Sequence, residues 1–181
     1  MTTIVRRFPL ATPHNFVYKG FMADERFDLA KELFEKAYTL QMQGELDLAI
    51  SLYKRSIDIR PTAEAYTFLG WTYRFQGKID EAIDECKKAI ALDPSFGNPY
   101  NDIGAYLIEK NRLDEAITWL EQAIASPRYD AYHYPWYNLG RIYVAKEMFN
   151  RARECFARSL EIQPGYAPAE EAVERLRRLI Q

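Results

Sequence analysis

Histidine and cysteine are both scarce in this sequence, which contains two of each among its 181 residues. Neither His14 nor His133 has a Ser, Cys or Asp at a spacing that would fix a catalytic partner, and no phosphate-binding loop, nucleophile elbow or zinc-protease motif is present. Cys86 and Cys155 are too few for a disulfide framework, so we expect buried or half-buried free thiols. The sequence therefore predicts a protein that is not an enzyme and holds no metal and no cofactor.

An excess of charge of one sign is also missing. The chain has 24 Lys and Arg against 26 Asp and Glu, for a formal net charge of −2. Residues 1–23 contain Arg6, Arg7 and Lys19 and no acid, so they carry +3 and the rest of the chain carries −5. A negatively charged body opposes a phosphate backbone, which argues against nucleic acid as a partner.

Long hydrophobic runs are absent as well. No apolar stretch approaches the roughly 20 residues that a membrane-spanning helix needs. Near the N-terminus, Pro9 and Pro13 interrupt the region where a signal peptide would have its apolar core. We therefore expect no membrane insertion and a cytoplasmic location.

What the sequence does contain is a fourfold internal repeat. Each copy has two small residues twelve positions apart, whereas the distance from one copy to the next varies between 21 and 24 positions. The pairs are Ala37 and Ala49, Gly70 and Ala82, Gly104 and Ala116, and Gly140 and Ala152. A constant spacing within each copy and a variable spacing between copies indicate a rigid unit that is joined to the next by a loop of variable length.

Each copy has the pattern of two helices. Apolar residues recur at helical spacing, as in the run from Ile79 to Ile90. Turn-forming residues mark the break between the two helices, and prolines end the second helix because they cannot donate a backbone hydrogen bond. The turn residues are Gly44, Gly77 and Asn111, and the prolines are Pro61, Pro94 and Pro164.

The fourth copy carries the most complete set of repeat residues, which are Trp136, Leu139, Gly140, Tyr143, Ala152, Phe156 and Pro164. This set resembles the tetratricopeptide repeat (TPR) pattern, W-x2-L-G-x2-Y, then A-x3-F, then P. The second copy is similar but has Cys86 in place of the second aromatic, the first has Leu33 in place of Trp, and the third lacks the final proline. The resemblance covers about residues 30–166. It implies an all-α fold, an alpha-alpha superhelix (solenoid) of four TPR helix-turn-helix units plus a C-terminal capping helix, nine helices in all.

The expected organisation is an extended N-terminal arm, four repeat units and a cap. The ranges are 1–23 for the arm, about 24–62, 63–96, 97–132 and 133–166 for the units, and 167–181 for the capping helix. The first helix should begin with Asp24 as its N-cap and run to about Gln43. Four placements of the arm stay open: against the first unit, in the groove of its own chain, in the groove of a neighbouring chain with self-association as the result, or undocked.

The resemblance also implies that the first helix of each unit lines a concave groove, which holds an extended peptide or a partner helix. The candidate groove residues are Phe34, Tyr38, Trp71, Arg74, Phe75, Asn98, Asn101, Tyr134, Tyr137, Asn138 and Arg141. Tyr, Trp and Arg are enriched at binding hot spots, and Asn can pair with a peptide backbone. The alternative for some of these aromatics, Tyr38 and Phe75 among them, is packing between units.

One TPR sub-family, the co-chaperones, grips a C-terminal carboxylate with a clamp of Lys, Asn and Arg. The clamp positions are occupied here by Phe34, Tyr38, Phe68, Asn98 and Asp102, and Asp102 would repel a carboxylate. We therefore expect no such clamp. The function that the sequence favours is a non-catalytic interaction module for a protein or peptide ligand; the alternative is an accessory or assembly factor of a larger complex, membrane-associated complexes included.

Overall fold

The structure is a computed structural model that describes residues 13–180, and this part of the chain forms nine α-helices without a β-strand. The helices are α1 (Pro13–Met42), α2 (Leu46–Ile59), α3 (Ala63–Phe75), α4 (Ile79–Leu92), α5 (Asn98–Glu109), α6 (Leu113–Ala125), α7 (His133–Ala145), α8 (Phe149–Ile162) and α9 (Ala167–Ile180). Within the described residues, no helix combines the length and the apolar character that crossing a membrane requires. The predicted all-α fold is confirmed.

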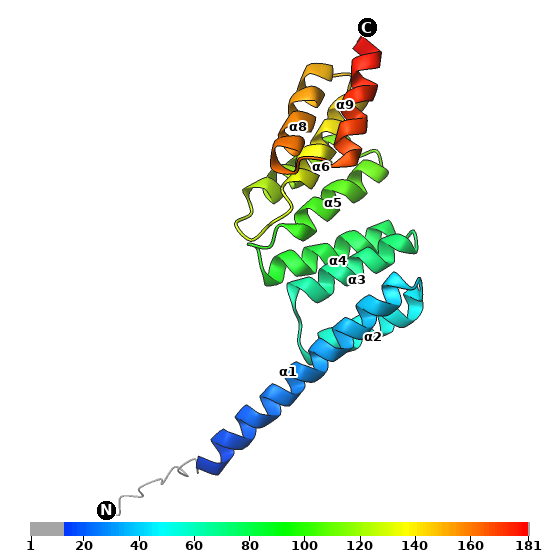
Figure 1. Ribbon diagram of the computed structural model, residues 1–181. Coiled ribbons are helices and arrows are strands. Elements are labelled where there is room, and N and C mark those ends of the chain that lie inside the picture. The colour runs from blue at the N-terminus through cyan, green and yellow to red at the C-terminus, as the bar shows by residue number, and fades with distance from the viewer. Residues whose placement is uncertain (1–12, 181) are drawn as a thin grey trace, which may run out of the picture.

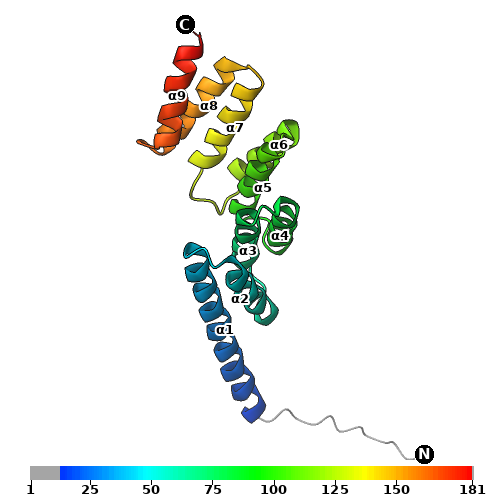
Figure 2. The ribbon, with the colours of Figure 1, turned by 90° about the vertical axis from the view of Figure 1, so that its right-hand side faces the viewer.

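Successive helices pack as antiparallel pairs, α1 with α2, α3 with α4, α5 with α6 and α7 with α8, and α9 packs on α8 (Figure 1). The pairs stack into an elongated array with α1 at one end and α9 at the other (Figure 2). The first helices of neighbouring pairs touch one another, α1 with α3, α3 with α5 and α5 with α7. These four helices therefore form one continuous face, which we call the inner surface. The predicted solenoid is confirmed.

Small residues allow the two helices of a pair to approach closely. A Cβ placed on Gly104 would lie 2.6 Å from Leu120 Cγ, and one on Gly140 would lie 2.4 Å from Phe156 Cε1, distances that real Cβ atoms do not adopt. The second helix of each pair completely buries an alanine: Ala49, Ala82, Ala116 and Ala152. The constant spacing in the sequence thus reflects one close helix crossing per pair, always in the same register.

The turn inside each pair has one residue with a positive φ. Gly44 and Gly77 adopt φ of 83° and 76°, and Asn111 adopts 57°. The fourth turn uses Glu147, with φ 57°, where the sequence shows no turn-forming residue. A non-glycine residue is uncommon in the left-handed region, so the fourth pair holds its turn through the packing of α7 and α8.

The N-terminal segment differs from the expected extended arm. Helix α1 begins at Pro13 and not at Asp24, so residues 13–23 are helical, and they extend past α2 and away from the other helices in both views (Figures 1 and 2). Proline is tolerated in the first helical turn because its missing N–H would have no partner there. Pro13 therefore starts the helix instead of breaking it. The rest of the expected arm, residues 1–12, lies outside the described residues.

Candidate binding surface

All eleven predicted groove residues lie on the four helices of the inner surface, two on α1, three on α3, two on α5 and four on α7. Apart from Tyr134, the structure divides them into three regions along the array. The first is an aromatic cluster on α1 and α3, the second is a polar row on α5 and α7, and the third is a pocket between α7, α8 and α9. Each region has a different chemistry.

The aromatic cluster is built around Phe68 of α3. Its ring centroid lies 5.2 Å from Phe34 and 5.6 Å from Tyr38 in edge-on contacts, and 5.2 Å from Trp71. Phe34 also meets the buried ring of Tyr53 on α2 at 5.5 Å, so the cluster is anchored to the core of the first pair. Phe68 was not among the predicted groove residues. The comparison with the co-chaperone clamp placed Phe68 at a clamp position, but it did not indicate that Phe68 is the centre of an aromatic cluster.

Three aromatic residues keep much of their surface in solvent. Tyr38 is 43% exposed, Trp71 38% and Phe75 55%. The alternative of packing between units therefore describes Phe34, which is half-buried, better than it describes Tyr38 and Phe75. With the exposed Met42 at the end of α1, these side chains form an apolar patch on the N-terminal half of the inner surface.

Arg74 is engaged within the protein. Its Nε and Nη2 both donate to Oε1 of Glu109 on α5, at 3.1 and 2.8 Å. The guanidinium also lies 5.6 Å from the centre of the Phe75 ring. Arg74 therefore links two neighbouring pairs, and its guanidinium lies near the exposed ring of Phe75.

A buried carboxyl group lies beside the cluster. Asp102 of α5 is 7% exposed; Asn101 Nδ2 approaches its Oδ1 at 3.5 Å, and its Oδ2 has no hydrogen-bond partner. Burial raises the pKa of Asp102 from 3.8 to about 7, while the polar side-chain groups of Asn101 and Trp71 act in the opposite direction. The expectation that Asp102 repels a carboxylate assumed an exposed charge. The group is instead covered and only partly ionised near neutral pH.

The polar row connects α5 to α7. Asn138 Nδ2 donates to Asn101 Oδ1 at 3.1 Å, and Arg141 Nη1 donates to Asn138 Oδ1 at 3.1 Å. Asn138 is buried, whereas Asn101 and Asn98 are half-buried and Arg141 is exposed. The Asn138 amide thus joins two pairs, and Arg141 is the member of the row that offers most donors to a ligand.

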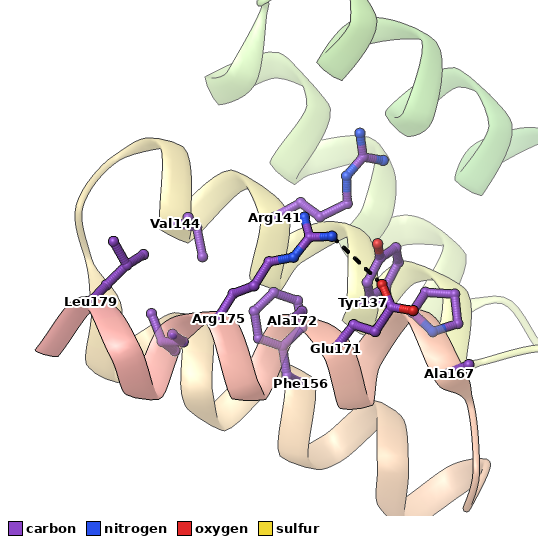
Figure 3. A pocket seen from close by; sticks show the side chains of 11 residues that line it. Tyr137, Arg141, Val144, Phe156, Ala167, Glu171, Ala172, Arg175 and Leu179 are labelled. Atoms are coloured by element: carbon purple, nitrogen blue, oxygen red, sulfur yellow. Dashed lines mark ion pairs between the residues drawn. The ribbon is translucent and has the colours of Figure 1, made fainter. Parts of the chain in front are cut away.

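The third region is a pocket with a volume of about 360 Å³ between α7, α8 and α9, which we call the C-terminal pocket (Figure 3). Its apolar lining includes Phe156, Ala172 and Leu176, and its other lining residues are Tyr137, Arg141, Val144, Ala167, Pro168, Glu171, Arg175 and Leu179. Tyr137 and Arg141 were predicted as groove residues. The contribution of α9 was not, because the amphipathic pattern of that helix indicates a cap but not the angle at which the cap docks.

Tyr134 lies apart from the pocket. Its ring centroid is 4.1 Å from that of His133 in a tilted contact and 5.6 Å from that of Tyr166 in an edge-on contact, in a group of aromatic rings at the start of α7. Burial lowers the pKa of His133, which favours the neutral imidazole. His133 is therefore part of the aromatic packing at this end of α7.

The two thiols are placed as the sequence predicts. Cys86 and Cys155 are both buried and unpaired. Burial raises the pKa of Cys86 well above its usual value and that of Cys155 to about 11, so both are protonated at neutral pH. Among residues 13–180, no three His, Cys, Asp or Glu side chains gather in a way that could hold a metal ion.

Antiparallel helix pairs that repeat along one axis, with a small residue at each crossing, define a helical-repeat solenoid. Family models described as tetratricopeptide repeat match residues 63–96, 100–126 and 133–166, which together make up more than half of the chain. The chain belongs to the tetratricopeptide repeat family.

Two curated relatives illustrate the range of proteins that contain similar repeats. Small glutamine-rich tetratricopeptide repeat-containing protein 2 of Mycosarcoma maydis is 28% identical over 104 residues, which cover 56% of this chain and 29% of that protein. The type IV pilus assembly protein PilF of Pseudomonas aeruginosa is 26% identical over 129 residues, which cover 69% of this chain and 51% of that protein. This chain therefore corresponds to a part of each relative.

Solved structures share the fold. The structure of Pseudomonas aeruginosa PilF superposes with a TM-score of 0.77 at 22% identity and covers 85% of this chain and 68% of that one. The first TPR of Spaghetti (RPAP3), bound to the HSP90 peptide SRMEEVD, superposes with a TM-score of 0.60 at 23% identity and covers 66% of this chain and 93% of that one.

Proposed function

We propose that this chain is a non-catalytic interaction module that binds an extended peptide or a helix of a protein partner along its inner surface. The family is a protein-interaction fold, and the single observation that carries the finer proposal is the exposed aromatic patch of Tyr38, Trp71 and Phe75. Aromatic side chains contribute large apolar area at little cost in conformational entropy, and they dominate binding hot spots. The patch therefore supplies anchor points for a partner.

A protein partner suits the surface better than a nucleic acid does. The chain without residues 1–23 carries a formal charge of −5, which opposes the phosphate contacts that dominate nucleic-acid affinity. Arg74, one of the cations beside the aromatic patch, is already paired with Glu109. We propose a cytoplasmic location, in keeping with the two cysteines remaining free thiols.

Capture of partners from a lysate of the source cells tests the binding proposal. Wild-type protein should retain a specific set of proteins, identified by mass spectrometry, and Trp71→Ala and Phe75→Ala should each lose most of it. A well-matched control is Leu48→Ala, because Leu48 lies on α2, outside the inner surface, and is 55% exposed, as Phe75 is. Equal retention by all four proteins would contradict the assignment of the aromatic patch.

A second candidate function is that of an accessory factor in the assembly of a larger complex, membrane-associated complexes included. The observation in its favour is the likeness to the type IV pilus assembly protein PilF, which extends over 69% of this chain. Fractionation of native cells tests it. Recovery of this chain with a membrane complex after mild detergent treatment would support the assembly role, and recovery as a free monomer would argue against it.

A further inference from the structure

The C-terminal pocket combines an apolar lining with an excess of positive charge at its rim. Two arginines, Arg141 and Arg175, and one acid, Glu171, line it. Arg175 Nη2 lies 3.6 Å from Glu171 Oε2, so these two charges offset each other across one turn of α9 (Figure 3). Arg141 has no carboxylate within ion-pair distance among the described residues, and its polar and cation–π contacts are with Asn138 and the ring of Tyr137.

Arg141 lies where the C-terminal pocket meets the polar row. Its side chain leaves α7 beside the pocket, and its guanidinium points away from the pocket lining (Figure 3). It donates one hydrogen bond to Asn138 at 3.1 Å, and a guanidinium has five N–H donors. A chain that leaves the pocket along the inner surface would therefore pass the unused donors of an exposed arginine.

We propose that the C-terminal pocket takes a large aliphatic or aromatic side chain of an acidic peptide, and that an Asp or Glu of the same peptide pairs with Arg141. This inference rests on the proposed function and adds the chemical class of the segment that binds at this end. The volume of about 360 Å³ is at the lower end of the roughly 300–1,000 Å³ range of ligand pockets. It suits one bulky side chain better than a folded surface.

Charge complementarity selects an acidic segment over a basic or neutral one. An arginine pairs with a carboxylate through charge-assisted hydrogen bonds that are stronger than neutral ones. A basic segment would place like charge beside Arg141, and a neutral segment would leave its guanidinium without a carboxylate partner. Residues i and i+2 of an extended peptide lie on the same side. The acid should therefore stand two positions from the apolar residue.

Selection from a phage-displayed library of random linear peptides tests this proposal and does not require the natural partner to be identified first. Wild-type protein should enrich peptides that carry a large apolar residue with Asp or Glu two positions away. Arg141→Glu should lose this acidic preference. The matched control is Arg153→Glu, which makes the same charge change at an exposed position of α8 that forms no ion pair with the described residues, and which should enrich the same peptides as wild type.

Titration of one enriched synthetic peptide gives the quantitative result. Changing its acid to the corresponding amide should weaken binding to wild type by about tenfold, the effect expected for loss of a charge-assisted pair, and should change binding to Arg141→Glu much less. Leu179→Ser should also weaken binding because it removes an exposed apolar side chain from the pocket. Leu92→Ser, at an exposed position at the end of α4, should not.

The outcomes separate this inference from the proposed function. Two results would overturn the pocket assignment. In the first, the enriched peptides show no acidic preference. In the second, loss of the acid weakens binding to Arg141→Glu as much as binding to wild type. If such peptides still require Trp71, the general function stands. A wild-type protein that enriches no peptide would overturn both.

Discussion

Asp102→Asn should stabilise the protein at neutral and alkaline pH, and the gain should disappear in acid. Burial raises the pKa of Asp102 in the folded protein to about 7, against an ordinary value of 3.8. At pH values between 3.8 and about 7, Asp102 holds a proton in the folded protein that it has lost in the unfolded chain. The free energy of unfolding therefore falls as the pH rises through this interval, and the contribution of the protonated group is lost above the folded pKa.

The size of the effect follows from the difference in pKa. One pKa unit corresponds to about 1.4 kcal/mol, so ionised Asp102 costs the folded state up to about 4 kcal/mol at about pH 8. Between about pH 5 and pH 7, the stability of wild type relative to Asp102→Asn should fall by about 2 kcal/mol. Asparagine has nearly the same shape, so packing against Trp71 and Asn101 is retained.

Urea denaturation followed by far-UV circular dichroism, carried out on both proteins across this pH range, measures the effect. The difference between the free energies of unfolding of the two proteins removes the contributions of titrating groups that they share, such as His133. The neighbouring Cys86, Tyr106 and Tyr129 have pKa values raised by burial and stay neutral throughout. A stability difference that stays constant between about pH 5 and pH 7 would show that Asp102 ionises as an ordinary carboxyl, and the reasoning would fail.

Two further predictions concern packing and the N-terminal segment. Gly104→Leu should destabilise the protein by roughly 1–3 kcal/mol or more in urea denaturation, because a Cβ at this position meets Leu120. Asp114→Ala should be nearly neutral, because Asp114 forms only an exposed ion pair with Lys146. The reverse order of the two effects would contradict the helix register. Deletion of residues 1–23 should leave the Tm nearly unchanged, because residues 13–23 extend past α2 and away from the other helices. A large fall in Tm would instead support a shielding role, and tighter partner binding after deletion would support docking of the segment in the groove.

The fold could be predicted because it depends on local patterns that repeat. Close helix crossings need small residues at fixed spacing, and Gly104 and Gly140 are placed against Leu120 and Phe156 as that spacing requires. The start of α1 could not be predicted in the same way. Pro13 is compatible with a break and with a first helical turn, and the sequence pattern alone did not distinguish the two.

The sequence could predict where the candidate site residues lie, but not which other side chains of the protein they contact. Which residues face the inner surface follows from the register of the first helices. Whether a side chain is free depends on how neighbouring pairs stack, and that stacking joins Arg74 to Glu109 and Asn138 to Asn101. Both contacts connect residues 35 or more positions apart, so no local sequence pattern predicts them.

The distribution of chemistry along the inner surface favours a partner segment that spans it. The exposed apolar residues Trp71 and Phe75 lie on α3, whereas the C-terminal pocket lies beyond α5, against α7 and α9. Between them the side chains are hydrogen-bonded to one another, so they contribute less binding energy than either end. A segment that reaches both ends gains the second contact at a high effective concentration, whereas a short peptide gains only one. An extended chain rises about 3.3 Å per residue against 1.5 Å for a helix, so it covers this distance with fewer residues and meets both ends with less of its sequence.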